Sequence, residues 1–248
     1  MFGNNKKKSL TSKEFIDVVK IVESYTTITT LLVGISETLG VKFSFYTHYP
    51  AVGSLDFKNS GISHVYNAPT EISNYFKKHT NDNTDDPLTV AVFEKGTFVW
   101  LSDANHEPHV ISSGYHDMVD MALKHLGDGM CCPLYGPDNR KGYVFVSFGR
   151  DKSEFDPIMP HQIYALAQIM HVRYCLMIKG LQRQIKLTLR ESEVLELISY
   201  GKTNPEIAMI LGISPRTVAV HASKVFIKLG TSDRVSAALR AQTIHIKI

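Results

Sequence analysis

The sequence predicts two domains of different fold class. The first is α+β, with an antiparallel sheet sandwiched by helices, and the second is all-α and built around a helix-turn-helix. Strand and helix patterns are mixed up to residue 184, whereas residues 185–248 show helical patterns alone. Charge divides the chain at the same place. Residues 185–248 hold nine Lys and Arg against five acids, or +4, and the preceding 184 residues hold 18 against 19, or −1.

The composition is that of an ordinary globular protein. The 248 residues are 44% hydrophobic and 21% charged with a net charge of +3, which argues against a disordered chain. Three cysteines, of which Cys131 and Cys132 are adjacent, cannot build a disulfide framework and favour a reducing compartment. No apolar run reaches the ~18 residues of a membrane helix, and the N-terminus lacks the apolar stretch of a signal peptide. We therefore expect a cytoplasmic protein that does not bind membranes.

The elements of the first domain follow from hydrophobic spacing and from turn residues. Helices are predicted at 9–39, Pro69–Lys78, from Pro87 onward, Ser112–Leu126 and Asp156–Gln184. Strands are predicted at Phe43–His48, Ile62–Tyr66, Thr97–Leu101, Met130–Tyr135 and Gly142–Phe148, the last two as a hairpin. Asp86 is expected to cap the helix that Pro87 begins.

These patterns also set the expected domain boundaries. Residues 1–8 read as a basic tail, residues 9–181 as the first domain, residues 182–187 as a linker and residues 188–248 as the second domain. The small basic second domain on a near-neutral body is typical of a nucleic-acid-binding module.

Capping residues divide the second domain into helices. Thr188 precedes Glu191 by three positions, which forms a capping box for a first helix that ends at Gly201. Asn204 is expected to cap a second helix, and Gly212 to make the turn after it. Ser214 caps a third helix with Pro215 at its first position.

The third helix has one face for packing and one for a ligand. Val218, Val225, Ile227 and Leu229 are predicted to anchor it, while Arg216, Ala219, Val220, Ser223 and Lys224 face outward. Such a helix, held across a shorter one by a glycine turn, fits the DNA major groove. Basic side chains beside it would bind phosphates; these are Lys202, Arg216, Lys224 and Lys228.

The motif string of this domain is dense. Leu187-Thr-x-Arg-Glu191 is followed by Gly201, Asn204, Glu206-Ile-Ala, Leu211-Gly-Ile-Ser, Thr217-Val, His221 and Lys228-Leu-Gly. Over residues 187 to 241 it strongly resembles the DNA-binding domain of the LuxR family of bacterial transcription regulators. The resemblance implies base contacts at Ala219, Val220 and Ser223. The whole expected DNA-contacting set is Lys202, Thr203, Asn204, Arg216, Thr217, Ala219, Val220, His221, Ser223, Lys224 and Lys228.

The first domain resembles the autoinducer-binding domain of quorum-sensing LuxR regulators. The matching positions are Asn67-Ala-Pro-Thr-Glu-Ile72, Phe76, Asp86-Pro87, Trp100 and Gly129. In that family a Trp and a Tyr donate to the carbonyls of an acyl-homoserine lactone, and an Asp accepts from its amide N–H. Ile72 and Phe76 replace the two donors here, whereas Asp86 keeps the acceptor. The resemblance implies a pocket for a small, largely apolar signal, lined by Ala68, Ile72, Phe76, Asp86, Val90, Trp100 and Ser147.

The interpretation is a ligand-responsive transcription regulator, not an enzyme, that binds a pseudo-palindromic DNA site as a homodimer. Its partners would be double-stranded DNA, a small autoinducer and RNA polymerase, and it would need no cofactor. Two alternatives stay open: a regulator that needs no ligand, and an enzyme with a fused DNA-binding tail. His106-Glu-Pro-His109 is one residue too short for a zinc helix motif, and His125 with Cys131 makes only a weak case for a nucleophile. No metal site is expected.

Overall fold

The computed structural model describes residues 9–25, 27–51, 54, 62–79, 86–181 and 185–241. The fold divides into two compact units, with the boundary on the main chain between Ile178 and Lys179. The predicted basic tail, residues 1–8, and residues 182–184 of the predicted linker lie outside the described residues.

The first unit is organised by one antiparallel sheet with the strand order β2-β1-β5-β4-β3. Its strands are β1 (Phe43–Tyr49), β2 (Ile62–Tyr66), β3 (Val99–Trp100), β4 (Asp128–Tyr135) and β5 (Lys141–Arg150). The hairpin of β4 and β5 is tight because Asp138 and Asn139 take positive φ angles of 58° and 57°, which these residue types tolerate. Strand β1 pairs with β5 from Phe43 opposite Ser147 to Tyr49 opposite Lys141.

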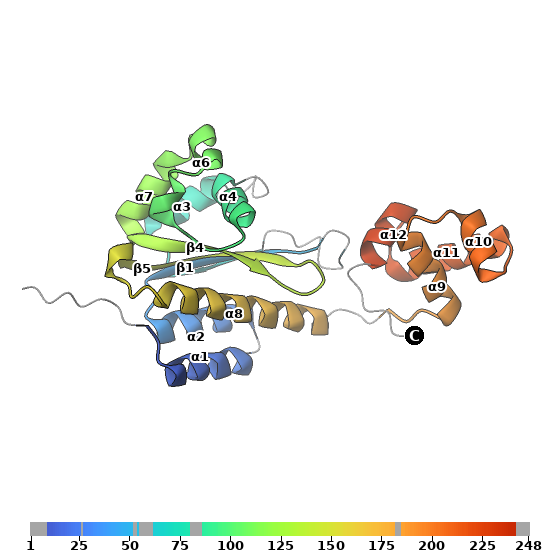
Figure 1. Cartoon of the computed structure of the whole chain (residues 1–248), viewed down its shortest axis with the longest axis horizontal. Coiled ribbons are helices and arrows are strands. Elements are labelled where there is room, and N and C mark those ends of the chain that lie inside the picture. The colour runs from blue at the N-terminus through green and yellow to red at the C-terminus, as the bar shows by residue number, and fades with distance from the viewer. Residues whose placement is uncertain are drawn as a thin grey trace, which may run out of the picture. The chain divides into compact units, whose positions relative to one another are not determined.

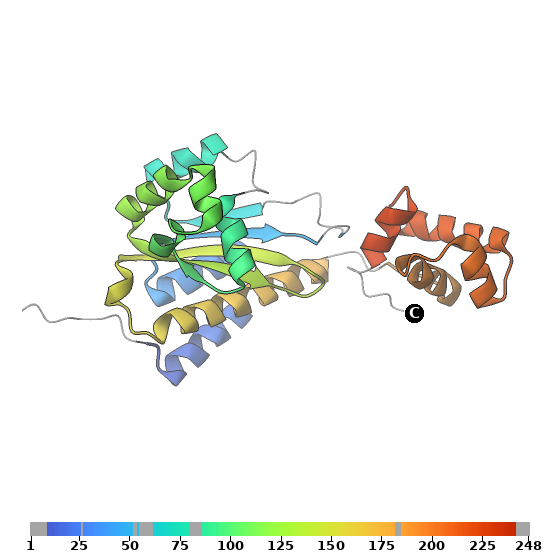
Figure 2. The same cartoon turned by 45° about the horizontal axis from the view of Figure 1, so that its top comes forward.

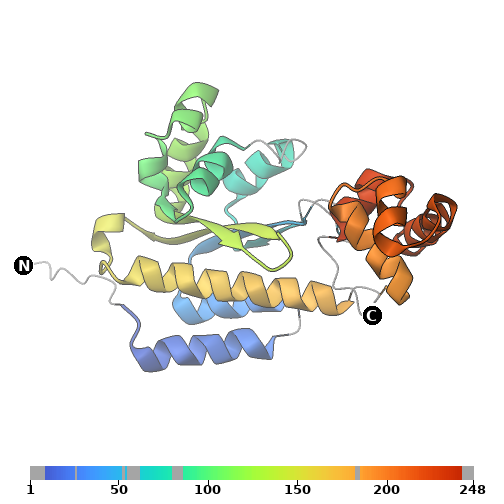
Figure 3. The ribbon, with the colours of Figure 1, turned by 45° about the vertical axis from the view of Figure 1, so that its right-hand side comes forward.

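Helices cover both faces of this sheet (Figure 1). One face carries α1 (Ser12–Ser24), α2 (Ile28–Leu39) and α8 (Met159–Leu181). The other face carries α3 (Thr70–His79), α4 (Pro87–Lys95), α5 (Leu101–Ala104), α6 (Pro108–Ser113) and α7 (His116–Leu126). Figures 2 and 3 show the same layers from two other directions. Among the described residues, no helix combines the length and the apolar character that a membrane crossing requires.

Two separate cores result from this layering. Residues 44 and 46 of β1 and 144 and 146 of β5 point toward α2 and α8, and the apolar ones among them belong to one buried cluster. Residues 43 and 45 of β1 and 143 and 145 of β5 pack against α3, α4 and α7 in another. The alternation has the period of two that a strand imposes. The predicted α+β class, with helices on both sides of an antiparallel sheet, is confirmed.

Several predicted elements differ from the structure in their limits. The helical stretch 9–39 is two helices, because Tyr25 is extended and Thr27 caps α2 by accepting from the Thr30 amide. The stretch 112–126 is likewise divided where Gly114 ends α6 with a φ of +70°. The predicted helix 156–184 is α8, which begins at Met159. Asp86 caps α4 as expected, with Pro87 at its first turn.

The second unit consists of α9 (Leu189–Ser199), α10 (Asn204–Leu211), α11 (Pro215–Leu229) and α12 (Arg234–Ala241). Thr188 and Glu191 form the predicted capping box, and Ser214 caps α11. The cap of α10 was assigned wrongly to Asn204. Thr203 occupies that position and donates its backbone N–H to Glu206 Oε2 over 2.7 Å. Asn204 instead accepts from the Arg234 side chain.

The core of this unit is formed by all four helices, since Ala237 of α12 is buried against α9 and α11. Val218, Ala222, Val225 and Leu229 are buried along one stripe of α11 with helical spacing. Ile227 was predicted to anchor this helix but is 79% exposed. It falls two residues from Val225 and two from Leu229, which places it on the opposite side of the helix. The all-α class and the helix-turn-helix of the second domain are confirmed.

Lys228 is also placed differently from its prediction. Its ammonium lies 2.5 Å from Glu191 Oε2, and the Glu191 side chain is only 4% exposed. Lys228 therefore neutralises a buried carboxylate and links α11 to α9, and a phosphate contact would have to compete with this pair. Burial alone would raise the pKa of Glu191, but hydrogen bonds from Lys228 and Thr188 lower it below the usual 4.5.

Replacing Lys228 by Met should destabilise the second unit by roughly 1–3 kcal/mol, because a buried carboxylate loses its partner. Hydrogen exchange of the α9 amides in the full chain measures this loss. A carboxyl group whose pKa is lower in the folded than in the unfolded state stabilises the fold at pH values above its unfolded-state pKa. This stabilisation is lost as the pH falls through the folded-state pKa. Protection of the α9 amides against hydrogen exchange should therefore decrease below pH 4.5 in the wild type. The decrease should be smaller in Lys228→Met. Lys224→Met, an exposed position on the same helix, is the control. Equal protection in both variants would contradict this role of Lys228.

Candidate functional site

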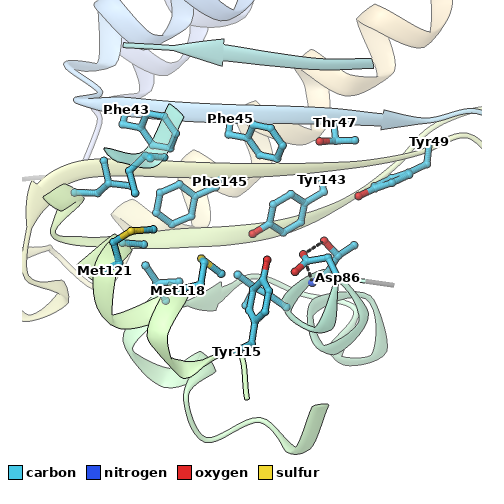
Figure 4. A pocket seen from close by; sticks show the side chains of 16 residues that line it. Phe43, Phe45, Thr47, Tyr49, Asp86, Tyr115, Met118, Met121, Tyr143 and Phe145 are labelled. Carbon is cyan, nitrogen blue, oxygen red and sulfur yellow. Dashed lines mark hydrogen bonds between the residues drawn. The ribbon is translucent and has the colours of Figure 1, made fainter. Parts of the chain in front are cut away.

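A cavity of about 100 Å³ lies between the sheet and the helices α3, α4, α5 and α7. Its floor is the face of the sheet formed by every second residue of β1 and β5, and its roof is mainly α7 and the start of α4 (Figure 4). The lining residues are Phe43, Phe45, Thr47, Tyr49, Ile72, Asp86, Leu88, Thr89, Leu101, Tyr115, Met118, Met121, Ala122, Leu126, Tyr143 and Phe145.

Polarity changes from one end of this cavity to the other. Along β1 the lining residues run from Phe43 and Phe45 to Thr47 and Tyr49. Six residues of strand span about 20 Å, so the apolar and polar ends are well separated. Met118 and Met121 lie opposite the phenylalanines, and Asp86 lies near the end of Tyr49 (Figure 4). The cavity is thus shaped for an amphipathic molecule.

Asp86 is the charged residue of the lining. Its Oδ2 atom accepts from the backbone N–H and the hydroxyl of Thr89, over 3.0 and 2.5 Å. Its Oδ1 atom is buried and has no hydrogen-bond partner among the described residues. A buried carboxylate oxygen without a donor is costly, so this atom marks a place where an N–H or O–H group would bind favourably.

Three tyrosines add hydroxyl groups to the polar half. The side chains of Tyr115 and Tyr143 point into the cavity together with Asp86 (Figure 4). Burial raises the pKa of Tyr49 to about 12, and it raises the pKa of Tyr143 well above its ordinary value. These hydroxyls therefore stay protonated, and each can donate as well as accept a hydrogen bond.

Of the seven predicted pocket residues, Ile72 and Asp86 line this cavity. Ala68 packs against the same apolar cluster without reaching the lining. Val90 borders a separate, open hollow beside Phe93 and Glu94. The side chain of Phe76 lies outside the described part of the chain.

Trp100 and Ser147 are corrections. Val99 faces the cavity side of the sheet, so its neighbour Trp100 points the other way and stacks at 5.3 Å on Phe155. Leu101 takes the place in the lining that was expected for Trp100. Ser147 donates its hydroxyl hydrogen to the backbone oxygen of Leu126, which uses its polar group inside the fold.

The sequence reasoning missed the aromatic floor and the three tyrosines. Alternation of Phe43, Phe45, Thr47 and Tyr49 was a readable signal for it. Gly129 is one of the positions that match the family pattern, and the structure gives it a physical reason. A Cβ atom there would lie 2.4 Å from the Phe145 ring, so only glycine leaves room for this cavity wall.

The second candidate site is the exposed face of α11. Arg216, Thr217, Ala219, Ser223 and Lys224 are all exposed. Val220, on the same face, is 49% exposed although it is apolar. This face is where the predicted base and phosphate contacts lie, and it is open rather than sealed in the core.

The other predicted DNA contacts have roles inside the unit. Lys202 is partly exposed, and Thr203 donates its hydroxyl hydrogen to Glu206. Asn204 is bonded to Arg234, and Lys228 to Glu191. His221 is partly buried on the packed side of α11. The exposed basic side chains on this face of α11 are therefore Arg216 and Lys224. Lys202, in the segment that precedes α10, is partly exposed.

Comparison with known proteins identifies the second unit. Residues 186–241 match the family described as bacterial regulatory proteins, luxR family. Residues 186–241 therefore form a LuxR-family domain. This resemblance, seen first in the motif string, is confirmed.

LuxR-type relatives also match the first unit. The quorum sensing-dependent transcriptional regulator RpaR of Rhodopseudomonas palustris is 27% identical over 94% of this chain and 93% of its own length. The activator AhyR of Aeromonas hydrophila is 32% identical over 61% of each chain. A crystal structure of Escherichia coli SdiA has the same fold, with a TM-score of 0.65 at 19% identity over 93% of this chain and 97% of that one. These relatives are transcription regulators and not enzymes.

Proposed function

We propose that this LuxR-type regulator is a cytoplasmic quorum-sensing receptor whose cavity binds one amphipathic signal molecule. The observation that supports it best is the Oδ1 atom of Asp86, buried in the polar half of an otherwise apolar cavity and without a donor among the described residues. A regulator that used this space only for packing would gain stability by filling it with an apolar side chain.

The lining indicates the chemistry of the signal. An N–H or O–H group of the ligand donates to Asp86, and the tyrosine hydroxyls bind its carbonyl oxygens. An acyl chain extends along Phe43, Phe45 and Phe145 toward Met121. Ile72 and Phe76 have no hydrogen to donate where the family has Trp and Tyr, so an acyl-homoserine lactone would lose two bonds, each worth about 0.5–1.5 kcal/mol. The signal is thus an acyl-homoserine lactone or another acylated polar head.

A solved structure supports the second of these options. SdiA in complex with octanoyl-rac-glycerol has a TM-score of 0.66 to this chain at 20% identity, over 95% of this chain and 97% of that one. That ligand combines an acyl chain with hydroxyl donors. Its chemistry fits a cavity with one apolar end, one carboxylate and several neutral hydroxyls.

The cavity must enlarge to enclose such a molecule. About 100 Å³ is below the roughly 300 Å³ of small ligand pockets. Met118 and Met121 are unbranched and flexible, so they can move aside at low cost. A ligand that binds the folded chain more tightly than the unfolded one also stabilises it, and this difference in affinity drives the response.

On DNA we propose a homodimer bound to a pseudo-palindromic site, with α11 of each subunit in successive major grooves. Arg216 and Lys224 bind phosphates, while Ala219, Val220 and Ser223 face base edges. Small and apolar side chains at these positions favour contact with thymine methyl groups and readout of DNA shape. Bound at a promoter, the dimer would act on RNA polymerase.

The signal-binding step is tested with Asp86→Ser. Serine still caps a helix but lacks the second oxygen. Octanoyl-homoserine lactone and octanoylglycerol are each tested by thermal unfolding. At least one of them should raise the melting temperature of the wild type. Asp86→Ser should bind that ligand about ten- to hundredfold more weakly, because a charge-assisted bond is lost.

Asp151→Ser is the matched control, because Asp151 caps a short helix that does not line the cavity. It should keep the full ligand response. If neither ligand nor a wider panel of acylated signals shifts the wild type, and DNA binding proceeds without them, the ligand-independent regulator is the correct alternative.

DNA binding is tested with Lys224→Ala in gel shifts at several salt concentrations. Loss of one phosphate contact should weaken binding to all sequences alike and reduce the slope of log K against log salt by about 0.9. Lys20→Ala, an exposed lysine on α1, should leave affinity and slope unchanged. An unaltered slope in Lys224→Ala would show that α11 is not the phosphate-binding surface.

A further inference from the structure

A second cluster of polar side chains lies on the other face of the sheet, between β1 and α8. His48 of β1 meets His171 and Cys175 of α8, and one ring nitrogen of each histidine and the sulfur of Cys175 lie within 4.8 Å of one another. The exposed fractions of the three residues are 1%, 0% and 0%. These residue types are ligands for zinc and related transition metals.

The pairs have separations that a metal ion requires. His171 and Cys175 are four residues apart and therefore share one face of α8. The Nε2 atom of His171 is 3.5 Å from the Sγ atom of Cys175. Tetrahedral zinc, with bonds of about 2.0–2.1 Å to nitrogen and 2.3 Å to sulfur, separates such ligands by about 3.3–3.6 Å. A small movement of His48 would bring the third ligand to the same distance.

His171 is also held in a suitable orientation. The hydroxyl of Tyr46 lies 2.8 Å from His171 Nδ1. In metal sites the nitrogen that does not bind the metal usually forms a hydrogen bond of this kind, which fixes the ring and its tautomer. The Nε2 atom also lies 3.5 Å from the backbone oxygen of Arg140, so metal binding would require the ring proton to reside on Nδ1, where Tyr46 accepts it, and would leave the Nε2 lone pair for the metal.

The backbone leaves room for the cluster at two glycines. A Cβ atom on Gly142 would lie 2.6 Å from His171 Nδ1, and one on Gly136 would lie 2.7 Å from Cys175 Sγ. Both glycines belong to the β4–β5 hairpin region, which approaches α8 here. The surrounding core is filled by aliphatic and aromatic groups. Burying two imidazoles there costs free energy that apolar side chains of similar size would not cost.

We propose that His48, His171 and Cys175 form a Zn²⁺ site. The zinc ion replaces the thiol proton of Cys175, which is released to solvent, and binds His48 and His171 as neutral imidazoles. The fourth position of the tetrahedron is left for a small ligand such as water. The ion fastens the C-terminal half of α8 to the sheet, on the face opposite the signal cavity. The site does not depend on the proposed signal.

The test begins with the full-length wild type. After denaturation with a chelator, the chain is refolded with Zn²⁺, with Co²⁺ or without metal, and unbound ions are removed by gel filtration. We expect elemental mass spectrometry to find one equivalent of zinc per chain. The zinc-loaded protein should melt at a higher temperature than the metal-free protein. Cobalt should give a thiolate-to-metal charge-transfer band in the near ultraviolet.

Three variants assign the ligands. Cys175→Ser should lose the charge-transfer band, and Tyr46→Phe should keep the band but bind metal about 10–100-fold more weakly, since only the orienting bond is lost. Cys132→Ser is the control, because Cys132 is equally buried in the same apolar cluster but outside the triad; it should bind metal like the wild type.

Two results would overturn the proposal. One is a wild type that refolds to the same circular dichroism spectrum and melting temperature with and without metal and retains none. The cluster would then be a hydrogen-bonded core network of Tyr46, His171 and Cys175. The other is a cobalt–thiolate band that survives in Cys175→Ser, which would place the metal on another cysteine. The first result needs no variant, so a folding defect in Cys175→Ser does not affect it.

Discussion

Neighbouring residues of β1 point to opposite faces of the sheet, and both functional features of the first unit depend on that alternation. Phe43 and Tyr49 form the floor of the proposed signal cavity, while Tyr46 and His48 reach α8 on the other side. A shift of register by one residue would exchange the two sets completely. The pairing of β1 with β5 prevents this shift, since Phe45 faces Phe145 across the central strand pair.

This strict division gives the two layers different tasks. The α7 side combines a flexible methionine lining with one carboxylate whose second oxygen has no donor among the described residues. It can therefore adapt to a ligand. The α8 side is closely packed around a long helix, and the proposed zinc ion would stiffen it further. A receptor that changes on one face and stays rigid on the other can translate binding into a defined structural response.

Local signals allowed much of the fold to be predicted. Capping residues such as Thr188 and Ser214, and the turn at Gly212, placed the helices of the second unit almost to the residue, because capping depends on neighbours only three positions away. The errors concern residues whose environment comes from elsewhere in the chain. Lys228 reads as a free cation until α9 brings Glu191 against it. Trp100 reads as a pocket wall until the pairing of β3 with β4 turns it toward Phe155.

The sequence by itself determined the class of each domain, the helix-turn-helix and the helix cap Asp86, since periodicity, caps and motif spacing are properties of short segments. Only the tertiary structure decided which tyrosines surround that carboxylate and that His48 meets His171 and Cys175. The three tyrosines are 28 to 94 residues apart, and His48 lies 123 residues before His171. Their proximity depends on strand order and on the packing of α8, which arise from the collective burial of apolar surface and leave no local pattern in the chain.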